Sequence, residues 1–332
     1  MNDLILKYMD EAIKIIDNSK NIFIASHINP DGDNIGSSLS LALALSKLNK
    51  NVTVLIADDI PDDYTFLPGI DLFKDYDESL GQIDLFIAVD SSDIDRLGKN
   101  KDLLNKSEKI INIDHHISNT KFGHINIVDH QLAATGELIY YLIKRMGINL
   151  DKEIATNIYT AINTDTGRFS YESVSSNTHR IAAELIDAGI DIKFINFKLY
   201  ESSSIERTNL FISALTNLNT YSNSRIATVK VSQKMLEETK TNINDTEGIV
   251  SFIRSIESVE VSCLLKEISS NEIKISLRSK EYVNVASICE KFDGGGHVRA
   301  AGCTIFDDLD SAETKIIEEI MKNLGDSNER SN

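Results

Sequence analysis

The first half of the chain alternates short apolar runs with stretches of helical periodicity, and this alternation constrains the fold more than any other feature. Runs of strand character cover residues 22–25, 52–56, 85–89, 110–113 and 125–128. Apolar side chains recur at helical spacing over residues 35–48, 133–146, 154–162 and 178–188. The alternation predicts an α/β fold, with a mostly parallel sheet and helices on both faces. Ligands of such sheets bind beyond the carboxyl ends of the strands.

The second half predicts a smaller α+β domain. Strand-like runs cover residues 226–231, 259–266 and 272–279, and helical stretches cover residues 246–255, 283–291 and 312–323. Between the halves lies a polar helical stretch, interrupted by three consecutive serines, that is typical of a connector. We therefore predict a first domain over residues 1–190, a helical linker over 191–219, a second domain over 220–326 and a disordered tail over 327–332.

Histidine and aspartate side chains gather where the first predicted strand ends. The segment ASHINPDGDNIGSS leads from this strand into a helix, so its loop carries His27, Asp31 and Asp33 at the carboxyl edge of the sheet. Asp31 and Asp33 are two residues apart, and a turning backbone can aim them at two neighbouring metal ions. Gly32 and Gly36 permit the tight backbone and the close helix approach that this arrangement needs.

Three further segments place similar residues at the ends of elements. Asp90 directly follows the apolar run DLFIAV and is the natural bridging ligand. The run KIINIDHH ends in Asp114, His115 and His116, and Asp165 lies just beyond a helix in AINTDTGRF. Any one of these segments alone would be typical of an Asx turn or a polar strand end. Together with the loop after the first strand, they converge on one edge of the sheet and predict a single site.

The charges of this site predict a pair of metal ions. Its four aspartates would repel one another without cations, and two divalent ions would neutralise them. Imidazole and carboxylate ligands without thiolates favour Mn²⁺ or a similar ion over structural Zn²⁺. Two such ions activate a water molecule and stabilise charge on a phosphoryl oxygen, so we predict hydrolysis of a phosphate ester. The four aspartates are Asp31, Asp33, Asp90 and Asp165.

Composition limits the partners and the location of the chain. With 34 Lys and Arg against 51 Asp and Glu, the formal net charge is −17, which repels a long nucleic acid outside local sites. Cys263, Cys289 and Cys303 form no CxxC pair and leave an odd thiol, which favours a reducing cytoplasm over a disulfide framework. We find neither a signal-peptide pattern nor a run of about 18 apolar residues, and we expect no membrane association.

The four motifs resemble those of the DHH phosphoesterases, a family named for the triplet seen here as Asp114-His115-His116. The later segment GGGHVRAAG, residues 294–302, resembles the glycine-rich motif of the DHHA1 domain that accompanies them. The resemblance spans residues 21–304 and is greatest with the NrnA-type members of the family. It implies a manganese-dependent enzyme that hydrolyses very short RNA to mononucleotides and 3′-phosphoadenosine 5′-phosphate (pAp) to AMP, and it implies a homodimer.

The resemblance also implies a role for each residue of the predicted site. Asp90 would bridge two manganese ions, and His116 would face the substrate phosphate, where it stabilises the transition state or protonates the leaving oxygen. Asp114 would hydrogen-bond a metal-binding imidazole through the ring nitrogen that does not face the metal. One manganese would be bound by His27 and Asp31, and the other by Asp33, His115 and Asp165.

The glycine motif predicts substrate recognition by the second domain. Consecutive glycines expose backbone N–H groups to an anion, although the same triplet also suits a plain tight loop. The GK[ST] ending of a P-loop is absent, which disfavours triphosphate chemistry. For Arg168, a phosphate contact and a structural salt bridge are equally compatible with the sequence. The predicted substrate-binding residues are Gly294, Gly295, Gly296, His297, Arg299, Arg278 and Arg168.

Other functions compete with this prediction. Proteins with similar motifs include phosphodiesterases that open cyclic di-AMP or cut linear dinucleotides, and the motifs alone do not separate these from NrnA-type enzymes. An inorganic pyrophosphatase fits less well, because the glycine motif suits a ligand that bears a nucleoside. A single-strand exonuclease of the RecJ kind also fits less well, since the chain shows no basic track. A catalytically silent nucleotide-binding regulator is disfavoured by the intact ligand set.

Overall fold

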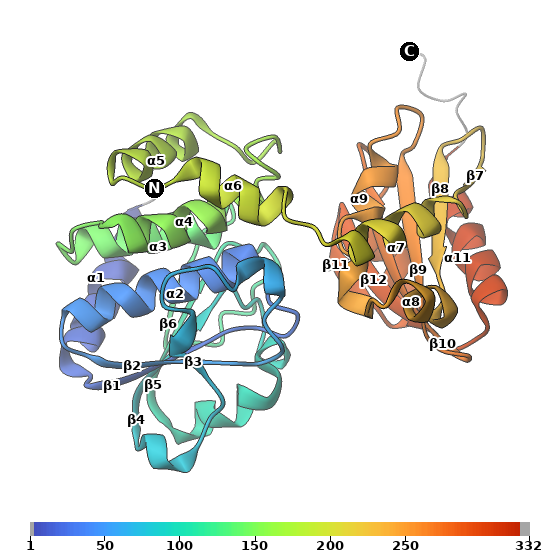
Figure 1. Ribbon diagram of the computed structural model, residues 1–332. Helices are drawn as coiled ribbons and strands as arrows, with labels where there is room; N and C mark the ends of the chain where they lie inside the picture. Colours follow the sequence, from blue (N-terminus) through green and yellow to red (C-terminus); the bar gives the residue numbers. More distant parts are fainter. Residues whose placement is uncertain (1–2, 326–332) are drawn as a thin grey trace. The chain divides into compact units, whose positions relative to one another are not determined.

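The computed structural model describes residues 3–325, and the chain divides into two compact units, Met1–Ser202 and Ser203–Asn332. The division falls inside the predicted linker, so that its first helix belongs to the first unit and its second helix to the second unit (Figure 1). The predicted disordered tail, residues 327–332, lies outside the described residues. No helix in the described part of the chain is long and apolar enough to cross a membrane.

The first unit contains a six-stranded sheet in which all neighbouring strands run parallel, in the order β3-β2-β1-β4-β5-β6. The predicted α/β class is therefore confirmed. The strand order reverses between β1 and β4, which is the position where open parallel sheets bind their ligands. The strands are β1 (Asn21–Ala25), β2 (Asn51–Leu55), β3 (Phe73–Lys74), β4 (Ile83–Val89), β5 (Ser107–Asp114) and β6 (Ile125–Val128).

Alternate residues of these strands enter two different cores, as the period of a strand requires. Ile22 and Ile24 of β1 pack into the large core beneath the α-helices, whereas Phe23 packs on the opposite face. That face is covered by 3-10 helices, chiefly η4 (Asp95–Lys106), rather than by α-helices. The helices of this unit are α1 (Asp3–Asn18), α2 (Gly32–Lys47), α3 (Thr135–Arg145), α4 (Lys152–Asp165), α5 (Ser176–Asp187) and α6 (Ile192–Tyr200).

Helices α2 and α4 approach each other closely because α2 carries a glycine at the contact. A Cβ added at Gly36 would lie 2.4 Å from the carbonyl oxygen of Asn157. Only glycine fits at that separation. The predicted close helix approach at Gly36 is confirmed, and it holds the amino end of α2 and the carboxyl end of α4 in a fixed relation.

The second unit is a mixed sheet in the order β11-β12-β10-β9-β8-β7, in which only β8 and β9 run parallel among the described strands. One face packs against α10 and α11, and the other packs against α7 and α9. The strands are β7 (Asn219–Tyr221), β8 (Ile226–Val231), β9 (Val261–Ser269), β10 (Glu272–Ser279), β11 (Gly295–His297) and β12 (Ala300–Ile305). The helices are α7 (Ile205–Leu215), α8 (Gln233–Thr239), α9 (Ile249–Arg254), α10 (Val285–Cys289) and α11 (Leu309–Asn323).

Candidate metal centre

Two aspartates at the start of α2 are fixed by helix amino ends; Asp33 lies in the first turn of α2 rather than in the loop where we expected it. Asp31 is the N-cap of α2, where its side chain accepts a hydrogen bond from the backbone N–H of Asn34 (3.1 Å). Asp33 accepts hydrogen bonds from the backbone N–H groups of Thr135 (2.6 Å) and Gly136 (2.9 Å). Helix α3 has no side-chain cap of its own, so Asp33 serves as its cap from a distant segment. The fold thereby orients both carboxylates.

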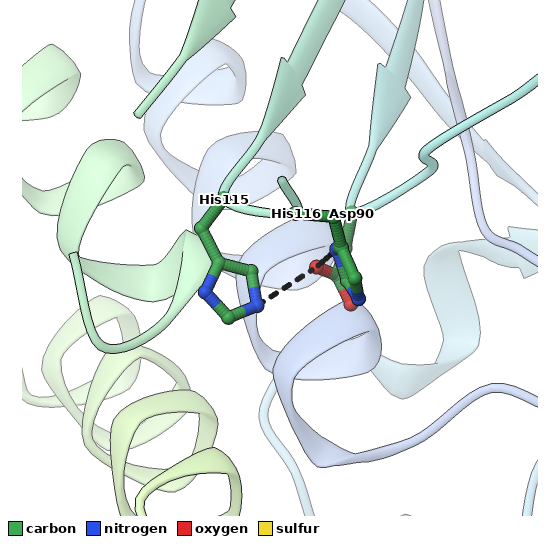
Figure 2. A group of neighbouring side chains, drawn as sticks. All are labelled: Asp90, His115 and His116. Carbon is green, nitrogen blue, oxygen red and sulfur yellow. Dashed lines mark ion pairs between the residues drawn. The ribbon is translucent and has the colours of Figure 1, made fainter. Parts of the chain in front are cut away.

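Asp90 lies at the end of the central strand β4 and is 2% exposed. Its φ of 57° lies in the left-handed region, which residues other than glycine rarely adopt. Its Oδ2 lies 3.4 Å from Nε2 of His27, and its Oδ1 lies 3.9 Å from Nε2 of His115. Figure 2 shows His115 and His116 facing this carboxylate. The two oxygens of Asp90 thus face different histidines, which is the arrangement that a bridging ligand needs.

His115 and Asp165 form a second group with Asp33. Nε2 of His115 lies 3.4 Å from Oδ2 of Asp165 and 3.8 Å from Oδ2 of Asp33. Nδ1 of His115 lies 3.3 Å from the carbonyl oxygen of Leu132, which orients the ring when Nδ1 carries the proton and leaves Nε2 for a cation. Asp165 is the last residue of α4 rather than a residue beyond it.

These side chains fit divalent cations. In each of three groups, the offered ligand atoms all lie within 4.8 Å of one another. Nε2 of His27 is buried and makes no hydrogen bond within residues 3–325, which is unfavourable unless a cation takes its lone pair. Imidazole nitrogens and carboxylate oxygens together suit divalent ions of the first transition row. The groups are His27, Asp31 and Asp90; Asp33, His115 and Asp165; and Asp90, His115 and His116.

The crowding of carboxyl groups changes their protonation. Burial raises the pKa of Asp33 well above its usual range, and the charges of Asp90, Asp165 and Asp31 raise it further. Burial also raises the pKa of Asp165 to about 6; His115 opposes this shift, and Asp31 and Asp90 add to it. Without cations the cluster therefore retains protons near neutral pH, and cation binding would release them.

His116 is held by Asp114, which corrects one prediction. We expected Asp114 to orient a metal-binding imidazole, but its Oδ1 hydrogen-bonds Nδ1 of His116 at 2.6 Å. Nδ1 of His115 instead faces the carbonyl oxygen of Leu132, so the carboxylate of Asp114 is available to bind His116. Burial acts to lower the pKa of His116, but Asp114 and the charge of Asp90 outweigh it and raise the pKa to about 9. A protonated His116 beside Asp90 is suited to delivering a proton.

Arg168 follows α4 in a turn of unusual conformation. Gly167, Arg168 and Phe169 all have positive φ, at 54°, 62° and 61°. The exposed guanidinium of Arg168 lies 3.7 Å from the ring centroid of Tyr200 in α6. Such a stack fixes the arginine by a cation–π contact. The stack covers one face of the guanidinium of Arg168.

In the second unit, two of the predicted recognition residues share one rung of the sheet. Arg278 of β10 pairs with Ala300 of β12, and Ala300 pairs with His297 of β11. Directly paired residues of antiparallel strands project to the same face, so Arg278 and His297 flank a small side chain. A Cβ added at Gly294 would lie 2.3 Å from the carbonyl oxygen of Gly302, so the start of this hairpin requires glycine.

The remaining residues of the glycine motif divide between an open position and structural contacts. A Cβ added at Gly295 would meet nothing within 4 Å, whereas Gly296 has a φ of 144° and lies close to the backbone of Ala300. The guanidinium of Arg299 donates hydrogen bonds to the carbonyl oxygens of Val283 (3.0 Å) and Glu281. Arg299 therefore ties the loop before α10 to the hairpin.

Two lysines that the sequence analysis missed lie on the same face as Arg278. Lys274 of β10 pairs directly with Lys266 of β9, and Lys274 and Arg278 are four residues apart on one strand. Like charges at paired positions destabilise a sheet. Burial, together with Lys274 and Arg278, lowers the pKa of Lys266 to about 8. The alternation in EIKISLRS could have placed Lys274 beside Arg278, but only the strand register reveals Lys266.

Comparisons with known proteins agree with both units. Residues 21–162 match the model of the DHH family, N-terminal domain, and residues 223–325 match that of the DHHA1 domain. A Thermus thermophilus protein named bifunctional oligoribonuclease and PAP phosphatase NrnA is 33% identical over 96% of this chain and 94% of its own length. A Bacillus subtilis protein of the same name is 26% identical over 89% of this chain and 93% of its own length.

A solved structure covers the same extent. The crystal structure of an exopolyphosphatase-related protein from Bacteroides fragilis superposes with a TM-score of 0.91 at 32% sequence identity. The match covers 96% of each chain. The similarity therefore extends through both units and is not confined to the segment that carries the metal centre.

Proposed function

This chain belongs to the DHH family and carries a DHHA1 domain, as its motifs predicted, and we propose that it hydrolyses very short oligoribonucleotides and pAp. It is a hydrolytic phosphoesterase by family. The observation that carries the proposal is a pair of neighbouring histidine–aspartate groups, one with Asp90 and one with His115, whose Oδ1 and Nε2 atoms lie 3.9 Å apart. The chain is also 33% identical to a protein named for both activities. The products would be mononucleotides from RNA and AMP from pAp.

Two divalent cations, with Mn²⁺ as the proposed ion, complete the centre. His27 and Asp31 would hold one, and Asp33, His115 and Asp165 the other, with Asp90 shared between them. The grouping of these ligand atoms supports this division, as does Nε2 of His27, which is buried and makes no hydrogen bond within residues 3–325. When bound, such ions lower the pKa of a water molecule and offset charge on a phosphoryl oxygen.

His116 carries the proton that the leaving group needs. Its ring lies beside Asp90 and its Nδ1 is held by Asp114. Burial acts to lower the pKa of His116, but the Asp114 carboxylate acts to raise it. After the phosphorus–oxygen bond breaks, the departing sugar oxygen would otherwise leave as a strongly basic alkoxide. Proton delivery from His116 removes that barrier. Asp114 keeps the imidazole in the orientation from which it donates.

The second unit supplies a cationic surface for the rest of the substrate. Arg278 and His297 flank Ala300, and Lys266 and Lys274 extend the same face along β9 and β10. Four residues of a strand span about 13 Å, so these side chains fit a few phosphates rather than a long track. Gly295 leaves backbone open to a ligand. This arrangement supports short substrates in a chain with a net charge of −17.

A panel of substrates tests the proposal. Purified protein with Mn²⁺ is given linear di- and trinucleotides, a longer RNA, pAp and cyclic di-AMP, and the products are separated by chromatography. We expect mononucleotides from the short RNAs and AMP from pAp, with slower turnover of the longer RNA and of cyclic di-AMP. The Asp90→Asn variant should lose activity by about a thousandfold or more on every substrate. Preferred hydrolysis of cyclic di-AMP would instead support the competing phosphodiesterase function.

We also propose a homodimer in a reducing cytoplasm. The homodimer follows the resemblance to NrnA-type proteins, and light scattering should give twice the chain mass of 37.0 kDa at micromolar concentration. A mass of one chain would contradict it. The three cysteines are free and buried, which supports a compartment where thiols stay reduced.

A further inference from the structure

The backbone at Asp90 is held on both sides by side-chain amides. Asp90 adopts a left-handed conformation that needs support from its surroundings. The carbonyl oxygen of Val89, just before it, accepts a hydrogen bond from Nδ2 of Asn34 (2.8 Å). The carbonyl oxygen of Ser91, just after it, accepts a hydrogen bond from Nδ2 of Asn112 (2.9 Å). The proposed bridging ligand therefore lies between two fixed peptide groups.

Asn119 connects this backbone to the proposed proton donor. Its Nδ2 lies 2.6 Å from Oδ2 of Asp114, 2.7 Å from Oδ1 of Asn112 and 3.2 Å from the carbonyl oxygen of Ser91. The other oxygen of Asp114 holds His116. Asn119 is thus bonded at once to the loop that carries Asp90 and to the carboxylate that orients His116.

The orientation of the Asn119 amide is fixed. Its Oδ1 accepts a hydrogen bond from the backbone N–H of Lys121 (2.7 Å), a donor that cannot be reversed. Its Nδ2 must therefore be the atom that faces the three acceptors. The backbone N–H of Asn119 also donates to the carbonyl oxygen of His116 (3.2 Å), so the side chain and the histidine belong to one turn.

We propose that Asn119 is a positioning residue that holds Asp90 and His116 in the relative positions that one reaction step requires. This role rests on the proposed function, in which Asp90 bridges the cations and His116 protonates the leaving oxygen. Through Asp114 it fixes the direction of the imidazole, and through Asn112 and Ser91 it fixes the loop that presents Asp90. A shift of either group relative to the other would separate bond cleavage from proton delivery.

The chemistry of the position favours asparagine. The acceptors around Nδ2 need a neutral group with two N–H donors, and Lys121 needs an acceptor on the same side chain. Aspartate has nearly the same shape but would place an acceptor, and a second negative charge, against Asp114. Alanine would leave the second oxygen of Asp114 without its donor and free the carboxylate to rotate.

The leaving group of the substrate tests this role. In the full chain with Mn²⁺, Asn119→Ala and Asn119→Asp are compared with wild type on a linear dinucleotide and on a p-nitrophenyl ester of a nucleotide. The nitrophenolate leaves without protonation, whereas the sugar oxygen does not. We expect kcat on the dinucleotide to fall about ten- to a hundredfold, with KM within about twofold, and kcat on the ester to fall about tenfold less. Equal losses on the two substrates, or no loss, would overturn the proposal.

A matched control is Asn126→Ala. Asn126 has an amide that also ties a loop of this unit, and both of its hydrogen bonds are with the N–H and carbonyl groups of Gly123 rather than with Asp114 or Ser91. Asn126→Ala should change kcat on the dinucleotide and on the nitrophenyl ester by the same factor. Thermal unfolding monitors folding, and Asn119→Ser, which keeps one donor, makes the same comparison if Asn119→Ala does not fold.

A measurement that needs no turnover separates this proposal from the proposed function. In protein labelled with ¹⁵N-histidine, the Nδ1–H resonance of His116, assigned with His116→Gln, should shift in the Asn119 variants and stay in place in Asn126→Ala. An unshifted resonance in the Asn119 variants would overturn the positioning role even if the enzyme is active. Conversely, a wild-type protein that hydrolyses none of the phosphoesters would contradict the proposed function. The shift of the His116 resonance would still test the positioning role of Asn119.

Discussion

The aspartates of the metal centre are placed where they repel one another, and Asp165 shows the consequence for a single residue. Its pKa is raised to about 6, mainly by burial, with His115 opposing and Asp31 and Asp90 adding to the shift. An unfolded chain would ionise this carboxyl near its ordinary pKa of about 3.9. Between these two values the folded metal-free protein binds more protons than the unfolded chain, so its stability falls as pH rises through this window.

Cation binding should therefore stabilise the protein less at acid pH. A bound cation needs the ionised carboxylate, so affinity falls as pH falls through about 6, while protonation relieves the repulsion in the metal-free form. Both effects reduce the increase in Tm that Mn²⁺ produces at about pH 5 compared with about pH 7.5. Thermal unfolding with and without Mn²⁺ at the two pH values measures this difference. An equal increase in Tm at both pH values would show that cation binding does not depend on ionisation of Asp165.

The Asp165→Asn variant isolates the contribution of this carboxylate. It should raise the Tm of the metal-free protein at neutral pH, because one of the mutually repelling negative charges is gone. It should also shrink the increase in Tm with Mn²⁺, because one ligand is lost. Asp10→Asn is a control of equal chemistry, since the exposed Asp10 pairs with Arg145 on the surface and contacts no residue of the centre. If Asp165→Asn instead lowers the Tm of the metal-free protein, the negative charge of Asp165 stabilises the fold and the prediction is wrong.

At the scale of elements, the hairpin of β11 and β12 contains one glycine with no room for a side chain and one that faces open space. Gly294→Ala places a Cβ 2.3 Å from a backbone oxygen, so it should lower the free energy of unfolding by about 1–3 kcal/mol. Gly295→Ala meets nothing within 4 Å and should leave stability unchanged, but it should raise KM if the substrate approaches this backbone. Denaturant unfolding and kinetics of the two variants make the comparison. Equal stability of the two variants would contradict the predicted steric difference.

The elements that the sequence predicts well are those with a strong apolar period. Residues 272–279 alternate along β10, and the predicted strand has the bounds of the observed one. The segment GGGHVRAAG has no such period, and its two strands form because β12 can pair with β10, a contact that is remote in sequence. The 3-10 helices that cover the second face of the first sheet were likewise not foreseen, because short helices carry little periodicity.

The site follows the same division between local and remote signals. The sequence grouped the candidate ligand residues because they lie where an apolar run ends, where a helix begins or where a helix ends. It did not reveal which imidazole Asp114 would hold, because adjacent histidines are equivalent until the backbone oxygen of Leu132 engages one of them. It did not reveal Asn119 or Lys266 either, since their roles depend on partners from other strands.

At the scale of the whole molecule, the charge of −17 makes local cations decisive for substrate binding. Lys274→Ala should raise KM for a dinucleotide by about two- to fivefold, which is the range expected for one exposed ionic contact. The effect should diminish as salt increases. Lys234→Ala is the matched control, because its side chain is 80% exposed on α8 of the same unit. An equal change in KM for both variants would show that the net charge of the chain, and not a local contact of Lys274, causes the effect.

We propose that one centre holds two cations and that both are needed to hydrolyse a short nucleotide. The most direct test adds Mn²⁺ in steps to metal-free protein while dinucleotide hydrolysis is followed at enzyme concentrations above the dissociation constants. We expect little activity at one equivalent per chain and a plateau at two equivalents, with no plateau for Asp90→Asn. Full activity at one equivalent, or activity without any divalent cation, would contradict it.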